Sequence, residues 1–172
     1  MKDHRLGQAL LLAGLRGAVR RRATVMTAAA IALAVVGVAV RARAVKLAAT
    51  DENKKVVLAF YEAGLNRKDF AAAAKFFGPR YVQHNPTATD GPGGFGKFLD
   101  YLRTQYPESH AEIKRVLAEG NFVVLHVLER LRPHDRGNAI VDIFRLENGK
   151  IIEHWDVKQP VPESPANPNG MF

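Results

Sequence analysis

The chain of 172 residues contains no cysteine, which excludes disulfides, thiolate nucleophiles and cysteine-bound zinc. Its larger part also lacks any excess of charge. The formal net charge of +8 arises in the first fifty residues, where nine Lys and Arg face the single acid Asp3. Residues 51–172 carry sixteen basic and sixteen acidic side chains. Because nucleic-acid binding requires a basic surface that neutralises phosphates, we expect no nucleic-acid partner.

A long apolar run occurs once, at residues 23–40, which are uncharged and largely apolar. Its eighteen residues are just enough to span a bilayer, which takes about 20 residues of helix. Arginines precede it, and Ala42-Arg43-Ala44 has the small-x-small form of a signal peptidase site. We therefore predict that residues 1–50 are a basic leader with a signal or anchor segment, which implies membrane association or export to the periplasm or extracellular space.

Basic residues also follow the apolar run, which argues against translocation because the Lys and Arg bias of the flanks sets orientation. The alternative is a misassigned start or an amphipathic tail on a cytoplasmic protein.

Apolar residues at helical spacing predict three helices after residue 51. The first ends near Asn66, the second runs from a cap at Asp69 to just before Gly78, and the third ends near Pro107. A short extended piece covers residues 81–86. The periodicity then changes to two, which predicts four strands at 110–118, 122–131, 138–146 and 150–158. Residues 160–172 form a tail rich in proline and asparagine.

Helices followed by hairpin-linked strands predict an α+β fold, with the helices on one face of an antiparallel sheet. The Asn148-Gly149 pair is typical of a tight hairpin turn.

Alternation along the strands places His126 and Asp142 among large apolar neighbours. A polar group left without a partner there costs about 1–3 kcal/mol. A carboxyl group in an apolar cavity is suited to acid/base chemistry near neutral pH. With His84, His154 and Asp156 the two give five titratable residues on or beside one sheet, as a proton-transfer site requires. The alternative is structural: His126 and Asp142 bond to each other or to the backbone within the core.

Three histidines and two aspartates could also bind a metal. Their spacing includes no HExxH helix, and we predict no metal site.

Several stretches of this chain resemble the SnoaL-like proteins of the NTF2-like superfamily, which are predicted to catalyse aldol condensation and include polyketide cyclases. The resemblance rests on Tyr81-Val-Gln-His-Asn-Pro86, on the residues from Asp142 to Asp156, on Gln159-Pro160, and on the closing Asn167 to Phe172. It implies an NTF2-like cone over residues 51–159, with three N-terminal helices on a curved antiparallel sheet and an enclosed hydrophobic pocket. It also implies catalysis without a metal or an organic cofactor.

In the family's cyclases an aspartate on the last strand serves as acid or base, and Asp156 matches it by motif position. Those cyclases have a histidine on the preceding strand where this chain has Asp142.

Our hypothesis is a cofactor-independent cyclase or isomerase acting on a small hydrophobic carbonyl compound. Asp156 is the predicted acid or base, and Asp142, His126 and His84 orient it and polarise the carbonyl. The predicted substrate-binding residues are Tyr61, Asn85, His154 and Trp155. Two alternatives remain. One is a non-catalytic module that binds a small molecule in the same pocket, and the other is a structural homodimer built on the outer face of the sheet and the tail.

Overall fold

The computed structural model describes residues 33–172. Ten residues of the predicted apolar segment, 23–32, lie outside the described residues, so the signal or anchor role stays a prediction. The chain divides into two compact units, residues 1–45 and 46–172. In the first unit, residues 33–45 are helical and exposed. Within the described part of the chain, no helix combines the length and the apolar character that a membrane span requires.

The second unit begins with helical segments, one of which has the predicted cap at Asp69. Residues 46–61 are helical and continue into a π-helical turn, η1 (Glu62–Asn66). Helix α2 (Phe70–Ala73) is capped by Asp69, whose carboxylate accepts a hydrogen bond from the Ala72 amide at 3.0 Å. A 3-10 turn, η2 (Ala74–Phe76), follows it. Helix α3 (Gly91–Gln105) begins with a proline in its first turn, where the missing N–H has no helical partner to lose.

The sheet has five strands in the order β1-β5-β4-β3-β2. The four predicted strands are present as β2 (His110–Glu119), β3 (Phe122–Arg130), β4 (Asn138–Glu147) and β5 (Lys150–Pro160), each antiparallel to the next. Asn148 and Gly149 have φ values of 51° and 70°, so they form the primed turn that the Asn-Gly pair predicts.

The fifth strand, β1 (Phe77–Gln83), differs from the sequence prediction, which ended the second helix at Phe77. The seven-residue spacing of Phe70 and Phe77 places both side chains on the core side of a continuous helix. A short helix followed by a strand can bury the same two residues, so the spacing does not distinguish the two structures. Strand β1 pairs in parallel with β5 at the edge of the sheet, where Pro79 is tolerated because an edge strand needs fewer amide donors.

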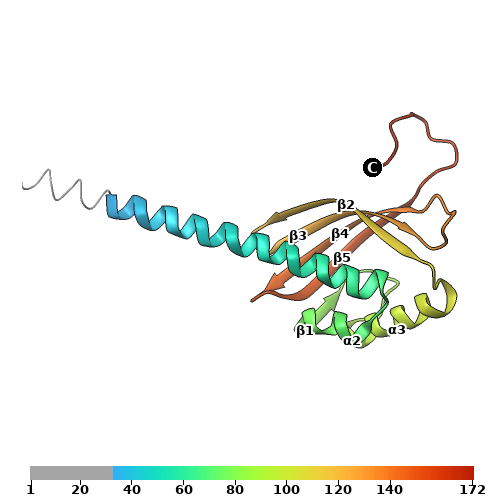
Figure 1. Cartoon of the computed structure of the whole chain (residues 1–172), viewed down its shortest axis with the longest axis horizontal. Coiled ribbons are helices and arrows are strands. Elements are labelled where there is room, and N and C mark those ends of the chain that lie inside the picture. The colour runs from blue at the N-terminus through green and yellow to red at the C-terminus, as the bar shows by residue number, and fades with distance from the viewer. Residues whose placement is uncertain (1–32) are drawn as a thin grey trace, which may run out of the picture. The chain divides into compact units, whose positions relative to one another are not determined.

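The helices pack on one face of the sheet, so the predicted α+β architecture is confirmed (Figure 1). Their contact with the sheet is largely aromatic: the Phe60 ring lies 5.2 Å from Phe77, 5.0 Å from Phe95 and 5.9 Å from Phe144. We call this helix-covered side the inner face, and the opposite side the outer face. Residues 161–172 contain no helix or strand, and Phe172 stacks on His126 of the outer face with ring centroids 5.2 Å apart.

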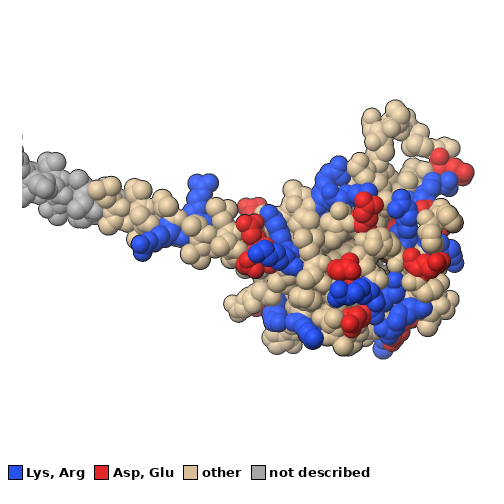
Figure 2. Space-filling view, in the orientation of Figure 1, with Lys and Arg blue, Asp and Glu red and all other residues tan. Residues whose placement is uncertain are grey.

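Charges of both signs are interspersed on the visible surface of residues 46–172, in keeping with the balanced composition of this part of the chain (Figure 2).

Candidate active site

A cavity of about 460 Å³ lies between the inner face of the sheet and the helices. Its volume falls in the range of about 300–1,000 Å³ that small-molecule sites occupy. The walls are mostly aromatic, with Phe60, Tyr81, Phe95 and Phe144 among the lining residues. The polar residues are supplied mainly by β4, β5 and the segment that follows β1. The cavity is therefore an apolar chamber with a polar group on its sheet side.

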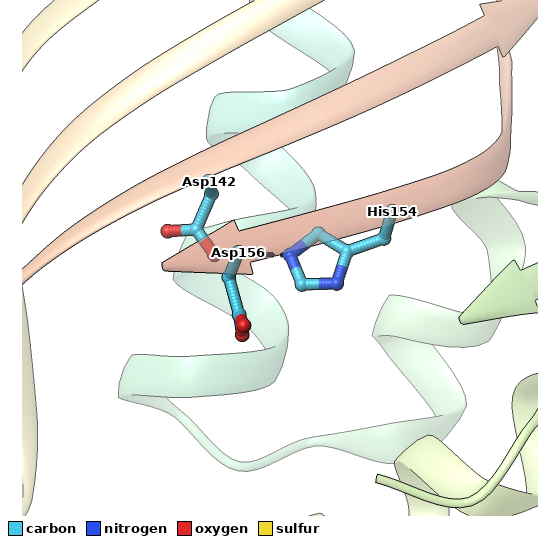
Figure 3. Close-up of side chains that lie close together, drawn as sticks. All are labelled: Asp142, His154 and Asp156. Atoms are coloured by element: carbon cyan, nitrogen blue, oxygen red, sulfur yellow. Dashed lines mark hydrogen bonds and ion pairs between the residues drawn. The ribbon is translucent and has the colours of Figure 1, made fainter. Parts of the chain in front are cut away.

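Strand register brings the two aspartates and a histidine together. Asp142 of β4 pairs with Asp156 of β5, and Phe144 pairs with His154, so all four side chains share the inner face. Asp142 and His154 are 5% and 8% exposed, and Asp142 Oδ1 lies 3.0 Å from His154 Nε2. Figure 3 shows the side chains of Asp142, His154 and Asp156 extending from these adjacent strands toward one another.

Asp142 has a second partner on the helical side of the cavity. The Tyr61 hydroxyl donates to Asp142 Oδ2 at 3.0 Å. Burial of Tyr61, together with the neighbouring Asp142 carboxylate, raises the pKa of its phenol well above the usual value. Tyr61 therefore stays a hydrogen-bond donor throughout the physiological pH range.

The second carboxylate, Asp156, is half-buried and is held from the end of β1. The side-chain amide of Asn85 donates to both carboxylate oxygens, at 2.7 Å and 2.8 Å. Asn85 is itself oriented by Thr87, whose amide and hydroxyl donate to Asn85 Oδ1 at 2.8 Å and 2.7 Å. These hydrogen bonds hold the Asp156 carboxylate in one orientation at the cavity wall.

Two residues that sequence reasoning did not select complete the group. Gln83 Oε1 lies 3.0 Å from His154 Nδ1, and Gln83 Nε2 donates to the Tyr81 hydroxyl at 3.1 Å. Burial and the nearby Asp142 carboxylate raise the pKa of the Tyr81 phenol, so it too remains protonated. The alternation Tyr81-x-Gln83-x-Asn85 is the signal that a strand assignment beginning at Phe77 would have supplied.

A separate ion pair also borders the cavity. Lys158 of β5 pairs with the buried carboxylate of Glu129, which also accepts from the Asn138 side chain at 3.1 Å. Sequence reasoning did not identify this pair, because its partners are far apart along the chain.

Five of the eight predicted site residues line the cavity: Tyr61, Asn85, Asp142, His154 and Asp156. The other three lie on the outer face. The prediction that His126 sits among core residues is wrong, because the β3 residues in the helix-covered core are Val123, Leu125 and Val127, and His126 alternates with them.

Each of these three outer residues has partners of its own. His126 Nδ1 lies 2.9 Å from an Arg115 guanidinium nitrogen. His84 stacks on Trp155 with ring centroids 4.6 Å apart, and its Nε2 lies 2.9 Å from Glu153 Oε1. The reason is again alternation: His84 lies between Gln83 and Asn85, and Trp155 between His154 and Asp156, so both point away from the cavity.

Asp142, His154 and Asp156 could also supply metal ligands, since their donor atoms lie within 4.8 Å of one another. His154 and Asp156 have the His-x-Asp spacing of a facial triad, which the prediction of no metal site wrongly took to be absent. A transition metal would bind at about 2.0–2.1 Å from the imidazole nitrogen. Because Asp142 Oδ1 already faces His154 Nε2 at 3.0 Å, Asp142 would have to move to admit it. The present geometry is that of a hydrogen bond.

Residues 57–154, more than half of the chain, match the SnoaL-like domain family, and the chain belongs to that family. No curated protein matches the chain.

Solved structures confirm the NTF2-like fold. AclR from Streptomyces galilaeus, provisionally described as a hydroxylase, is 22% identical over 64% of this chain and 90% of its own, with a TM-score of 0.55. A Bacillus cereus protein provisionally described as a polyketide cyclase is 21% identical over 62% of this chain and 74% of its own, with a TM-score of 0.56. A Kribbella flavida protein provisionally described as a ketosteroid isomerase is 18% identical over 69% and 85%, with a TM-score of 0.56. At these identities the likeness establishes the fold, and function must be argued from the site.

Proposed function

We propose that the chain is an acid/base enzyme of the cyclase or isomerase type, which moves a proton on a small, largely apolar carbonyl compound held in the cavity. The observation that carries this proposal is the Asp156 carboxylate, which is ordered by Asn85 at the wall of an aromatic chamber. A carboxylate in such surroundings is a general base within reach of a bound ligand. The similarity to proteins described as a polyketide cyclase and a ketosteroid isomerase supports the same class of reaction.

In this proposal Asp156 removes a proton from the carbon next to the carbonyl group, and charge develops on the carbonyl oxygen. The proton donor for that oxygen is the hydroxyl of Tyr81, which lines the cavity, accepts from Gln83 Nε2 and stays protonated because its pKa is raised. The Tyr61 hydroxyl is not available for this role, because it donates to Asp142. The surrounding aromatic residues exclude water, which strengthens each electrostatic contact in the cavity. His84, His126 and Trp155 take no part, because they lie on the outer face.

The test is hydrogen exchange on rigid bicyclic ketones such as 2-tetralone and 2-decalone. The full chain is incubated with each ketone in deuterated water, and loss of the proton next to the carbonyl is followed by NMR. We expect exchange above the buffer rate, and we expect Asp156→Asn to reduce it to the buffer rate. Glu153→Gln is the matched control, because Glu153 is a carboxylate of the same strand that faces outward.

Exchange that persists at full rate in Asp156→Asn would remove Asp156 from the mechanism. Binding of the ketones without exchange in the wild type would instead support the second candidate, a non-catalytic binding module. The aromatic lining of the cavity favours that candidate among non-catalytic functions.

We also propose that the outer face of the sheet forms a homodimer. Phe122 and Val157 are 43% and 69% exposed there, and the His84–Trp155 stack lies beside them. Light scattering on the full chain and on Val157→Lys tests this interface, and a wild-type monomer at micromolar concentration would contradict it.

Export or membrane anchoring through residues 23–40 is likewise a proposal, supported by the apolar run and by the basic residues before it. Fractionation of cells expressing the full chain and a chain that begins at residue 46 would test it. Recovery of both chains in the same soluble fraction would contradict the proposal.

A further inference from the structure

His154 has a potential acceptor at each ring nitrogen. Nδ1 lies 3.0 Å from Gln83 Oε1, and Nε2 lies 3.0 Å from Asp142 Oδ1. A neutral imidazole carries a hydrogen on only one of these nitrogens, so its neighbours decide which one. The neighbours here lie on different strands, β1 and β4.

The orientation of the Gln83 amide is determined by a donor that cannot reverse. The main-chain N–H of Asn85 donates to Gln83 Oε1 at 2.9 Å, while Gln83 Nε2 donates to the Tyr81 hydroxyl at 3.1 Å. A flipped amide would place its NH₂ group against the Asn85 N–H, and neither group could accept. Gln83 therefore presents its oxygen to His154, and Nδ1 must carry a hydrogen.

The side of His154 that faces Asp142 then holds one further hydrogen. With Nδ1 protonated, a neutral His154 presents a lone pair at Nε2 to Asp142 Oδ1. Two lone pairs 3.0 Å apart repel each other. Solvent does not relieve this repulsion, because Asp142 and His154 are only 5% and 8% exposed. A hydrogen between the two atoms removes the repulsion, whether it is bound mainly to the imidazole or mainly to the carboxyl group. In both cases the pair is neutral as a whole.

We propose that Gln83 is a positioning residue that fixes the Nδ1–H form of His154, so that Asp142 and His154 hold a single hydrogen between them. The inference rests on the proposed function in one respect, namely that Asp156 and not Asp142 is the base. The neutral Asp142–His154 pair is saturated by its own partners, Gln83 and Tyr61, and the Asp156 carboxylate remains the base that a substrate meets.

The same strand end controls both parts of the site. Gln83 is the last residue of β1 and Asn85 lies two residues beyond it. Both face inward: Gln83 bonds to His154 and Asn85 bonds to Asp156. A change that rotated this short segment would alter both the protonation of the Asp142–His154 pair and the orientation of the Asp156 carboxylate.

The test is the long-range proton–nitrogen NMR spectrum of the histidine rings in the full ¹⁵N-labelled chain, prepared after treatment with a chelator. His154 is assigned by the loss of its signals in His154→Gln. In the wild type we expect a hydrogen on Nδ1 across neutral pH, and a Nε2 signal between those of a free and a fully protonated nitrogen.

Two variants of Gln83 separate positioning from packing. Gln83→Met keeps the length of the side chain and removes the acceptor, so we expect Nδ1 to lose its hydrogen to solvent. The hydrogen shared with Asp142 should then be bound to Nε2. Gln83→Glu keeps an oxygen facing His154, so we expect Nδ1 to stay protonated.

A wild-type spectrum with a bare Nδ1 would overturn the inference, and this result does not depend on whether a variant folds. A His154 spectrum that Gln83→Met leaves unchanged would also overturn it, as would a transition metal that is bound to Nε2 until the chelator removes it. None of these measurements involves a substrate. Loss of the proposed function would appear instead as absent ketone exchange in a chain whose His154 spectrum is as expected.

Discussion

Removing single hydroxyl groups from the tyrosines around the cavity should cost stability in a defined order. The Tyr61 hydroxyl is buried and donates to Asp142 Oδ2 at 3.0 Å. Its removal would leave Asp142 Oδ2 buried without that donor, which costs about 1–3 kcal/mol. We therefore expect Tyr61→Phe to lower the free energy of unfolding by an amount in that range.

Two matched variants set the scale for this loss. Tyr81 is as buried as Tyr61, at 4% exposure each, but its hydroxyl is bonded to the neutral amide of Gln83. Tyr81→Phe should therefore cost about 0.5–1.5 kcal/mol, the range for neutral partners. Tyr101 is 50% exposed, and Tyr101→Phe should stay within about 0.5 kcal/mol of the wild type.

The assay is urea unfolding of the full chain, followed by far-ultraviolet circular dichroism, with the slope of each transition compared across variants. A double-mutant cycle of Tyr61→Phe with Asp142→Leu, which removes the acceptor at similar size, then isolates the contact itself. A Tyr61→Phe loss no larger than that of Tyr101→Phe, or additive losses in the cycle, would refute the view that Tyr61 and Asp142 form one buried unit.

Three further predictions concern other parts of the domain. Gly94→Ala should destabilise the fold and shift the loop beside the cavity, because an added Cβ would lie 1.9 Å from the Thr89 carbonyl oxygen. Gly93→Ala meets nothing within 4 Å and should instead stabilise the helix by about 0.4–1 kcal/mol; urea unfolding measures both, and equal effects would contradict this reading. Glu153 contributes to the acid stability of the fold, because its hydrogen bond to His84 and its pairing with Arg145 lower the pKa of its carboxyl below the ordinary 4.5. Because the pKa of Glu153 is lowered in the folded state, its contribution to stability is complete above pH 4.5 and is lost as the pH falls through the lowered value. Glu153→Gln should therefore flatten the acid limb of a curve of unfolding free energy against pH. An unchanged acid limb would contradict this prediction. The raised pKa of Tyr81 means that the folded state holds its proton more tightly, so stability should decline as the pH rises above 10.0, and Tyr81→Phe should lessen that decline in the same assay.

The site was predictable from the sequence only in part, and the reason differs from one residue to the next. Asp142, His154 and Asp156 could be grouped from the sequence because β4 and β5 are joined by the Asn148-Gly149 turn into one hairpin. Their exact pairing could not be predicted, because a register shift between Arg145 and Leu146 brings Asp142 opposite Asp156. Gln83 was missed because its role depends on the parallel pairing of β1 with β5, between segments about seventy residues apart. A local sequence pattern does not predict such a pairing, because parallel strands are joined by long connections.

His126 shows a different limit. Strand β3 carries apolar residues on both faces, with Val123, Leu125 and Val127 on one and Phe122, Val124 and Leu128 on the other. Period-two alternation separates the two sets but does not say which set the helices cover. In the structure the helices pack on the face that carries Val123, Leu125 and Val127. His126 therefore faces outward and stacks on Phe172.

The sequence by itself determined the α+β class, the four hairpin-linked strands, the family and the titratable residues Asp142, His154 and Asp156 of the candidate site. These follow from local signals: apolar periodicity, caps, turn residues and the motif from Asp142 to Asp156. Only the tertiary structure decided which strand face lines the cavity and which partner each polar group has. Those choices depend on contacts between distant segments, whose free energies are set by packing and burial rather than by neighbours along the chain.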